Sequence, residues 1–298
     1  MQAPFSIGIN YEGSTAGLLA AVLPFIGHLE IAPDSLSHRA QDGLRIHEAR
    51  LQELRRLPED LTILVHGVGL SIGSVDGWSA AYLGLLDELF MQLKISWHSE
   101  HLAYTQVAGE QLGTMLTLPR TTEVLEMVCD RVMILQDRYK VPFLLENVID
   151  MLPSYDPQFS EAEFLNRITA KTGCGLIIDV YNMECDEHNF GFDSTKFLDE
   201  LHVDSIYELH LAGGVTTDDF QMDIHAGLVK PSTIALAQQV TSRRCANLTA
   251  ITFEILDEFI GEVGVEKIVR QLQALDHLFN PQHELTVASD GTSSVDQP

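Results

Sequence analysis

The chain has 298 residues, 45% of them hydrophobic, and a formal net charge of −25. This length suits one large α/β domain or two small ones, and the acidic surface argues against nucleic acid as a partner because it repels the phosphate backbone. The first residues lack the features of a signal peptide, and the apolar run 16–26 falls short of the roughly 20 residues that span a bilayer. The four cysteines form no CxxC pair. We therefore expect a cytoplasmic protein with reduced thiols and no membrane partner.

Short β-prone runs alternate with helical patterns along the whole chain. The predicted strands are Phe5–Asn10, His28–Ala32, Leu61–His66, Ile95–His98, Val141–Glu146, Gly175–Val180, Ile206–Leu211 and Leu248–Ile255. The predicted helices are Gly17–Phe25, Asp42–Arg56, Trp78–Leu93, Val124–Tyr139, Ser160–Thr172, Ser194–Leu201, Pro231–Arg243 and Gly261–Leu278. Ser160 and Glu163 have the spacing of a capping box, and Pro231 suits the first turn of a helix.

This alternation predicts an α/β fold with a parallel sheet, and eight units predict a closed (β/α)₈ TIM barrel over residues 1–279. A doubly wound open sheet is the alternative, but no GxGxxG follows the first strand, which argues against a dinucleotide-binding version. From residue 280 onward the sequence becomes small and polar, so residues 280–298 are predicted to form a disordered C-terminal tail.

Polar side chains occur where six consecutive predicted strands end, and this is the face on which TIM barrels carry their active sites. Strands three to eight each bring a carboxylate or an imidazole to this face, either in the strand or in the loop that follows. The candidates are His66, His98, Glu100, His101, Glu146, Asp179, Asn182, His210, Asp223, His225 and Glu254.

A single histidine at a strand end is more often a hydrogen-bonded core residue than a ligand, and a single buried acid is more often a cap or an ion-pair partner. Burying several such groups together, however, costs several kcal/mol for each unless a positive charge compensates them. The ends of strands three to eight contain no lysine or arginine. The group therefore predicts a metal site at the C-terminal face of the barrel.

The candidate ligands are all nitrogen and oxygen donors, which suits Fe, Mn or Zn and argues against a structural zinc held by thiolates. They outnumber the ligands of one ion, so two or three ions are expected. His188 could reach the site or lie on the surface, whereas Cys174 and Cys185 are interpreted as small core residues. Ser71 is not surrounded by a GxSxG elbow, so a loop-capping hydroxyl is the better interpretation.

At these residues the chain resembles the multinuclear non-haem iron-dependent oxidative enzymes (the MNIO family), which include the iron oxidases of methanobactin and 3-thiaglutamate biosynthesis. The resemblance extends from about Gly8 to Leu275. The motifs that carry it are HGVGLSIGS (66–74), SEHLAY (99–104), LPRTTE (118–123), LLENV (144–148), GCGLIIDVYN (173–182), ELHLAGG (208–214), DIH (223–225) and FEILD (253–257).

The resemblance implies a TIM barrel that holds two or three irons in mixed-valent Fe(II)/Fe(III) form, with O2 as the cosubstrate. Family ligand or near-ligand positions correspond to His66, His101, Glu146, Asp179, Asn182, His210, Asp223, His225 and Glu254. Glu146 would be a bridging carboxylate, and Glu146, Asp179 and His210 are the expected catalytic residues.

The implied chemistry is oxidation of a cysteine in a ribosomally made precursor peptide. An iron–superoxo species would take a hydrogen atom from the cysteine β-carbon. A small partner protein that binds the peptide leader is also implied, in a heterodimer with this chain. The sequence departs from the family in two places: many members have a histidine where this chain has Gly214, and an Arg-Asp pair where it has Ile255–Leu256–Asp257.

Two other classes remain open on the residues alone. The first is a Zn- or Mn-dependent hydrolase or isomerase on a xylose-isomerase-like barrel, because nitrogen and oxygen ligands suit these metals as well. The second is a non-catalytic protein that binds metal or peptide.

Overall fold

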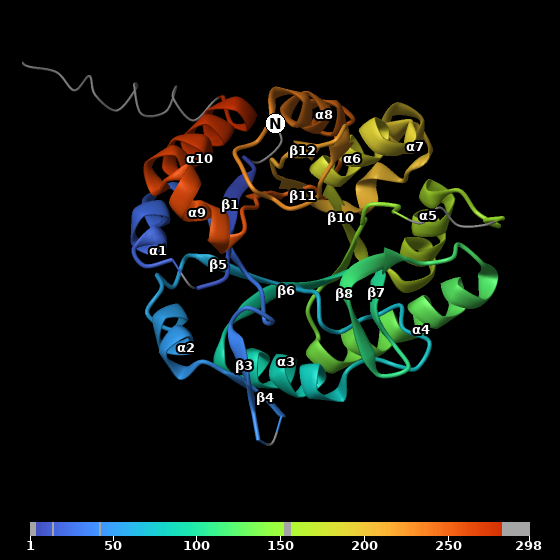
Figure 1. Cartoon of the computed structure of the whole chain (residues 1–298), viewed down its shortest axis with the longest axis horizontal. Helices are drawn as coiled ribbons and strands as arrows, with labels where there is room; N and C mark the ends of the chain where they lie inside the picture. The colour runs from blue at the N-terminus through green and yellow to red at the C-terminus, as the bar shows by residue number, and fades with distance from the viewer. Residues whose placement is uncertain (1–3, 14, 42, 152–155, 282–298) are drawn as a thin grey trace, which may run out of the picture.

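Eight parallel strands close into a barrel, and helices form a ring around it (Figure 1). The structure is a computed structural model, and it describes residues 4–13, 15–41, 43–151 and 156–281. The order of strands around the barrel is β1–β14–β11–β10–β9–β6–β5–β2. Their bounds are Ser6–Tyr11 (β1), His28–Ile31 (β2), Thr62–Gly67 (β5), Ile95–His101 (β6), Phe143–Glu146 (β9), Gly175–Asp179 (β10), Ile206–Leu211 (β11) and Ala250–Phe253 (β14). The predicted TIM barrel and its eight strands are confirmed.

The helices begin and end largely where local signals place them. Ser160 accepts a hydrogen bond from the Glu163 amide at 3.2 Å, and Gly173 ends that helix at φ 72°, as a left-handed C-cap does. None of the helices in the described ranges carries an apolar stretch long enough to cross a membrane. The helices are α1 (Leu18–Val22), η1 (Leu23–Phe25), α2 (Glu48–Leu54), α3 (Ala80–Gln92), α4 (Thr122–Tyr139), α5 (Glu161–Thr172), α6 (Val180–Phe190), α7 (Ser194–Glu200), η2 (Val203–Ser205), α8 (Pro231–Ser242), α9 (Asp257–Val263) and α10 (Val265–Phe279).

Three antiparallel hairpins that the sequence pattern did not predict stand outside the barrel sheet. They are β3 (Ser37–Ala40) with β4 (Gly43–Ile46), β7 (Ala103–Val107) with β8 (Glu110–Thr117), and β12 (Thr216–Thr217) with β13 (Phe220–Gln221). The last has Asp218 and Asp219 at φ 49° and 65°, the backbone of a two-residue turn that matches the twist of a hairpin.

Three predictions about helices were wrong. The helix expected over Asp42–Arg56 contains strand β4 over Gly43–Ile46, and the helix α2 forms only after His47, which is extended at ψ 111°. Helix α6 was not predicted, because its sequence is mostly polar and begins directly after a strand. The closing helix is two helices that meet at Gly264, whose φ of 88° interrupts the helical backbone.

The tail predicted from residue 280 falls almost wholly outside the described residues. Asn280 itself is described, and its side chain joins the end of α10 to Phe5, the residue before β1. It accepts a hydrogen bond from the Phe5 amide at 2.8 Å and donates one to the Phe5 carbonyl at 2.9 Å.

A buried polar layer lies inside the barrel. The indole of Trp97 donates to Glu208 Oε2 at 3.0 Å, and Thr252 Oγ1 is also bonded to the Glu208 carboxylate. The imidazole of His28 bridges Ser6 Oγ at 2.9 Å and Thr252 Oγ1 at 2.8 Å. Buried polar groups are stable when they are hydrogen-bonded in this way, so this layer is a fixed support for whatever lies above it.

The ring of His28 in this layer packs directly against the backbone of Gly8, and this contact can be tested by mutation. A Cβ at Gly8 would overlap the ring of His28, whereas a Cβ at the exposed helical Gly84 would meet nothing within 4 Å. We expect Gly8→Ala to lower the free energy of unfolding by about 1–3 kcal/mol through overpacking, and Gly84→Ala to raise it by roughly 0.5–1 kcal/mol through backbone entropy. Urea denaturation measures both changes, and equal effects at the two glycines would contradict this packing.

Candidate metal centre

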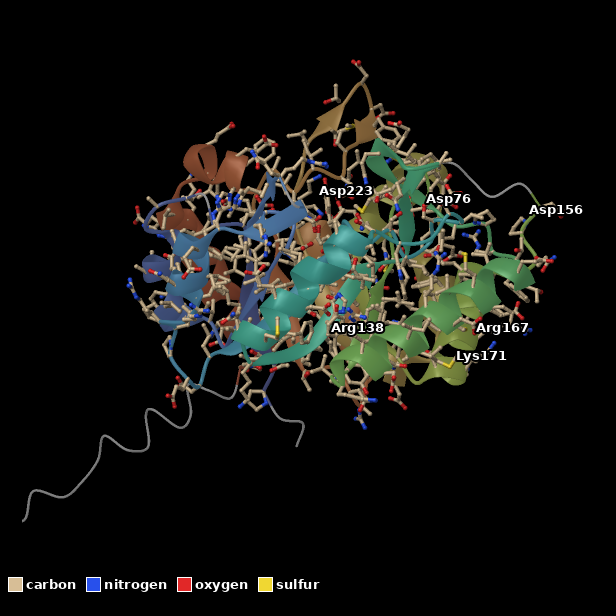
Figure 2. All side chains as sticks on the ribbon, turned by 90° about the horizontal axis from the view of Figure 1, so that it is seen from below. Asp76, Arg138, Asp156, Arg167, Lys171 and Asp223 are labelled. Atoms are coloured by element: carbon tan, nitrogen blue, oxygen red, sulfur yellow. The ribbon has the colours of Figure 1, made fainter. Side chains whose placement is uncertain are left out.

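The register of the barrel brings most of the predicted residues to one end. Glu146 and Asp179 are the last residues of β9 and β10, and neighbouring strands pair His101 with Glu146 and Asp179 with His210. A cavity of about 240 Å³ opens there. Figure 2 labels Asp223, another residue that lines this cavity, on the side of the molecule where the β12–β13 hairpin projects.

A first group of donor atoms consists of two imidazoles and one carboxylate. The Nε2 atoms of His66 and His101 lie 2.9 and 3.0 Å from Glu146 Oε2, and 3.4 Å from each other. Ligands on metal bonds of about 2.0–2.2 Å at near right angles are separated by about 3 Å. The group therefore has the spacing of three ligands on one face of a metal ion.

Hydrogen bonds to the protein fix both imidazole rings. The hydroxyl of Ser99 donates to the Val65 carbonyl at 3.0 Å, so its oxygen accepts from His66 Nδ1 at 2.9 Å. His101 Nδ1 donates to the Gly67 carbonyl at 3.0 Å. Each ring thus keeps its Nδ1 proton in a protein hydrogen bond, which leaves Nε2 as the atom that a metal can bind.

A second group shares the same glutamate. His210 Nδ1 lies 3.0 Å from Glu146 Oε1 and 3.1 Å from Glu254 Oε2. Asp179 completes this group, in which every donor atom lies within 4.8 Å of the others. On the far side of the ring, His210 Nε2 lies 3.2 Å from Glu30 Oε2. Glu146 therefore presents one oxygen to each group, as a bridging carboxylate does.

A looser third group surrounds His225, in the loop after β11. Its Nε2 lies 2.7 Å from Asp223 Oδ1 and 3.6 Å from Asp179 Oδ2. Asp179 Oδ1 accepts from the Asn182 amide at 2.8 Å, so this aspartate also caps helix α6. His225 has a φ of 40°, a left-handed backbone that is uncommon for a non-glycine residue and is often found at functional sites.

Opposite charges dominate the electrostatics of the cavity. Burial alone would raise the pKa of Glu146, but His101, His66 and His210 hold it well below its usual range. Burial alone would lower the pKa of His66, but Glu146 and Glu30 raise it to about 9. The pKa of His225 rises to about 10 against burial, mainly because of Asp223. The described residues that line the cavity include no lysine or arginine, so the imidazoles alone balance the carboxylates.

Buried polar atoms without a hydrogen-bond partner give a further test of whether a metal fits here. Eleven such side-chain atoms occur among the described residues, and seven of them belong to this site. Four of the seven face an oppositely charged group at 2.7–3.1 Å, whereas Glu30 Oε1, Asp179 Oδ2 and Asn182 Oδ1 have no partner this close. Such atoms are costly unless a ligand or ion satisfies them. The donor set therefore fits metal ions. The seven are Glu30 Oε1, Glu146 Oε2, Asp179 Oδ2, Asn182 Oδ1, Asp223 Oδ1, His225 Nε2 and Glu254 Oε2.

The candidates His98 and Glu100, and the less certain His188, lie outside the cavity. His98 and Glu100 bond to each other at 2.9 Å, and the His98 ring packs against Phe90 and Tyr139, behind the sheet. The exposed His188 bonds to the Asp219 carbonyl at 3.0 Å in the β12–β13 turn. None of these side chains lines the cavity.

Sequence reasoning missed Glu30. It is 1% exposed, it lines the cavity, and burial raises its pKa to about 7. An acid between the apolar residues Leu29 and Ile31 of the predicted strand was the available signal. Glu208, two residues before His210 and completely buried, was missed as well.

One of the two departures from the resembled family has a local explanation in the structure. A Cβ at Gly214 would meet the Tyr181 hydroxyl and the Met222 carbonyl, so only glycine fits this backbone. After Glu254, the Ile255 amide donates to Asn10 Oδ1 at 2.9 Å and the Leu256 amide donates to the His225 carbonyl at 3.2 Å. This segment therefore anchors the β11 loop through its backbone.

Known sequences similar to this chain include one family model and several curated proteins. A sequence model of the family described as RiPP precursor modification enzyme MbnB/TglH/ChrH matches residues 6–259. A UPF0276 protein of Vibrio vulnificus is 30% identical over 240 residues, which are 78% of this chain and 82% of that protein. A UPF0276 protein of Rhizorhabdus wittichii is 34% identical over 190 residues, 64% of this chain and 68% of that protein.

Solved structures share the barrel at much lower identity. An L-ribulose 3-epimerase superposes with a TM-score of 0.57 at 13% identity, over 98% of this chain and 100% of that one. A D-psicose 3-epimerase from Clostridium cellulolyticum gives 0.54 at 14%, over 90% and 96%. Endonuclease IV from Thermus thermophilus gives 0.53 at 16%, over 90% and 99%. At these identities the likeness concerns the fold alone.

The raised pKa values predict that metal binding releases protons. At pH 7 the metal-free protein keeps His66 and His225 protonated, because their pKa values are about 9 and 10, and a metal must displace these protons. We expect calorimetric titration with Zn²⁺ in buffers of different ionisation enthalpy to show proton release, and affinity to rise between pH 7 and 9. Binding without proton release would contradict the assignment.

The same shifts predict the stability of the metal-free protein. A histidine whose pKa is raised by folding stabilises the protein fully below its unfolded pKa of about 6.5. This stabilisation is lost as the pH rises through 9 to 10. Urea midpoints of the metal-free protein should therefore fall between pH 7 and pH 10, and midpoints that rise over this range would contradict the pairing.

Proposed function

Because the chain belongs to the RiPP precursor modification enzyme family MbnB/TglH/ChrH, we propose that it is an iron-dependent, O2-using oxidase that modifies a cysteine of a ribosomally made precursor peptide. The observation that carries the proposal is the group of His66, His101 and Glu146, whose carboxylate is shared with a second group. Two histidines and one carboxylate on one face are the ligand set of non-haem Fe(II) enzymes that use O2.

The residues would hold two or three irons in mixed-valent form. His66 and His101 would bind the first iron and His210 and Glu254 the second, with Glu146 as the bridge. Asp179, Asn182, Asp223 and His225 offer donors for a further ion. The bound irons would supply redox chemistry toward O2 and lower the pKa of a substrate thiol.

The side chains around the irons have separate roles. Glu30 accepts from His210 Nε2 at 3.2 Å, which orients the ring and directs Nδ1 toward the shared carboxylate. Glu146, Asp179 and His210 are the proposed catalytic residues, because their donor atoms converge where the two groups meet. The mostly apolar side chains Val68, Met115, Ile224 and Leu256 complete the cavity wall and limit the access of water.

The substrate and partner follow from the same assignment. A precursor peptide with a cysteine would enter the cavity from the barrel mouth. We propose a small leader-binding partner in a heterodimer, because the described residues form one barrel with short hairpins and no second folded unit that could bind a leader.

A Zn- or Mn-dependent hydrolase or isomerase is the second candidate. The observation that favours it is the ligand set, in which every donor is nitrogen or oxygen, and both metals accept such ligands.

Metal content separates the three groups of ligands. We expect His210→Ala and Asp223→Ala to lose different fractions of the iron bound by the wild type, because they belong to different groups. Plasma emission analysis of protein purified without oxygen gives the content, and Mössbauer spectroscopy identifies the irons that are lost. His188→Ala is the matched control and should keep full iron. Full iron in both His210→Ala and Asp223→Ala would contradict the assignment.

Oxygen uptake tests the reaction itself. The iron-loaded protein should consume O2 when a cysteine-containing precursor peptide is added, and a Cys→Ser version of that peptide should give at least a 100-fold slower uptake. Glu146→Gln should abolish uptake, because it removes the bridging charge. If stoichiometric zinc supports turnover and iron does not, the hydrolase or isomerase is the correct function.

A further inference from the structure

The two edges of the β7–β8 hairpin differ in how their backbone groups are used. The outer edge of β7 is covered by the loop that follows β5. The Gly73 amide donates to the Ala103 carbonyl at 2.9 Å, and the Thr105 amide donates to Ser71 Oγ at 2.8 Å. The Ser74 hydroxyl adds a bond to the Gln106 carbonyl. This edge is therefore closed.

The edge of β8 is open. Within the described part of the chain, no backbone group of Glu110–Thr117 bonds to a residue outside the hairpin. The ladder pairs Tyr104 with Leu116 and Gln106 with Gln111, so residues 112–115 of β8 lie opposite the single residue 105. The backbone of this bulged stretch is not paired with β7.

Strand β8 leads from solvent to the metal cavity. Its first five residues are exposed and its last three are half-buried. Leu112 is 39% exposed, whereas Met115 lines the cavity together with His66 and His101. In Figure 1, β8 lies between β7 and the opening of the barrel. A chain laid along this edge would therefore be directed into the cavity.

The sequence of the strand, EQLGTMLT, contains no lysine, arginine or proline, and these residues commonly prevent an edge from pairing with another chain. The bulge, in which Gly113 has a φ of 71°, divides the edge into two short extended stretches on either side of it. Across the mouth, Val215 and Met222 flank the β12–β13 hairpin and are 47% and 37% exposed. The mouth thus combines an open strand edge with an apolar rim.

We propose that the open edge of β8 binds an extended segment of the precursor peptide by strand addition, which positions the adjoining cysteine in the metal cavity. The proposal rests on the proposed function for the identity of the peptide. Strand addition obtains affinity from main-chain hydrogen bonds and selectivity from alternate side chains. An edge beside the cavity therefore suits a peptide whose sequence varies around the modified cysteine.

Charge favours a peptide over a second copy of this chain as the occupant. Asp76 accepts a hydrogen bond from the Ala108 amide near the hairpin tip, and Glu110 is exposed beside it, whereas Asp150 at the other end of β8 pairs with Arg120 at 3.6 Å. The whole chain has a net charge of −25. Two copies meeting at this edge would bring like charges together. A neutral or basic extended peptide has no such cost.

The test uses binding alone. The probe is a phage-displayed library of 12-residue peptides with one fixed cysteine, selected on the metal-free protein without O2. The most enriched peptide is then synthesised and its affinity measured by fluorescence polarisation for the wild type and four variants. Thr114→Pro and Leu112→Lys obstruct the edge, whereas Thr114→Ala and Leu112→Thr are the matched controls. Circular dichroism and urea midpoints show whether each variant is folded.

We expect both obstructing variants to weaken binding at least tenfold and both controls to stay within twofold of the wild type. Amide hydrogen exchange should slow within Glu110–Thr117 when the peptide is added. The proposal is overturned if the obstructing variants bind like their controls, if protection appears on another element, if no peptide is enriched, or if gel filtration shows a dimer that protects β8 without peptide. Because neither metal nor O2 is present, this result does not depend on the oxidase assay.

Discussion

One buried carboxylate organises the mouth of the barrel. Glu146 is 1% exposed, yet imidazoles from three other strands contact its two oxygens at 2.9–3.0 Å. Each contact is favourable only while positive charge, whether a proton or a metal ion, lies between the atoms. The buried carboxylates at the mouth therefore need positive charge nearby. None of the described residues that line the cavity is a lysine or arginine that could supply it.

The alternation of side chains along β6 shows how the barrel supports this arrangement. Trp97, Ser99 and His101 point to the same side at successive levels, as residues two apart do in a strand. The first bonds to Glu208, the second orients His66, and the third contacts the shared carboxylate. A single strand thus connects the polar layer within the barrel to the ligands at its rim.

The sequence predicted the features that depend on short-range patterns. The eight strands could be recognised from apolar runs, and the barrel from their alternation with helices. A polar residue at an apolar strand end was an equally local signal, which is why Glu146, Asp179 and His210 were found. The donor atoms of these side chains lie within 4.8 Å of one another, a spacing that fits a metal site.

What could not be predicted depends on contacts across the fold. The β7–β8 hairpin is defined partly by the loop after β5, which lies some 30 residues earlier. Glu30 could be noticed as an acid between two apolar residues, but its place in the cavity depends on the closure of the barrel. His98 and His101 were both candidates from the residues alone, and only the resemblance to the family selected His101 as a ligand. The strand extends three residues further than its apolar pattern indicated.

Asp179 links the local folding of a helix to the state of the cavity. One oxygen caps the first turn of α6, and the other is buried without a hydrogen bond. Most substitutions of Asp179 would therefore remove the cap of α6, which carries Asn182, together with the buried oxygen. Asparagine alone could keep a capping oxygen while it removes the negative charge from the cavity. In divergent relatives, a residue that both ends this strand and starts this helix should therefore remain aspartate or asparagine after the surrounding sequence has changed.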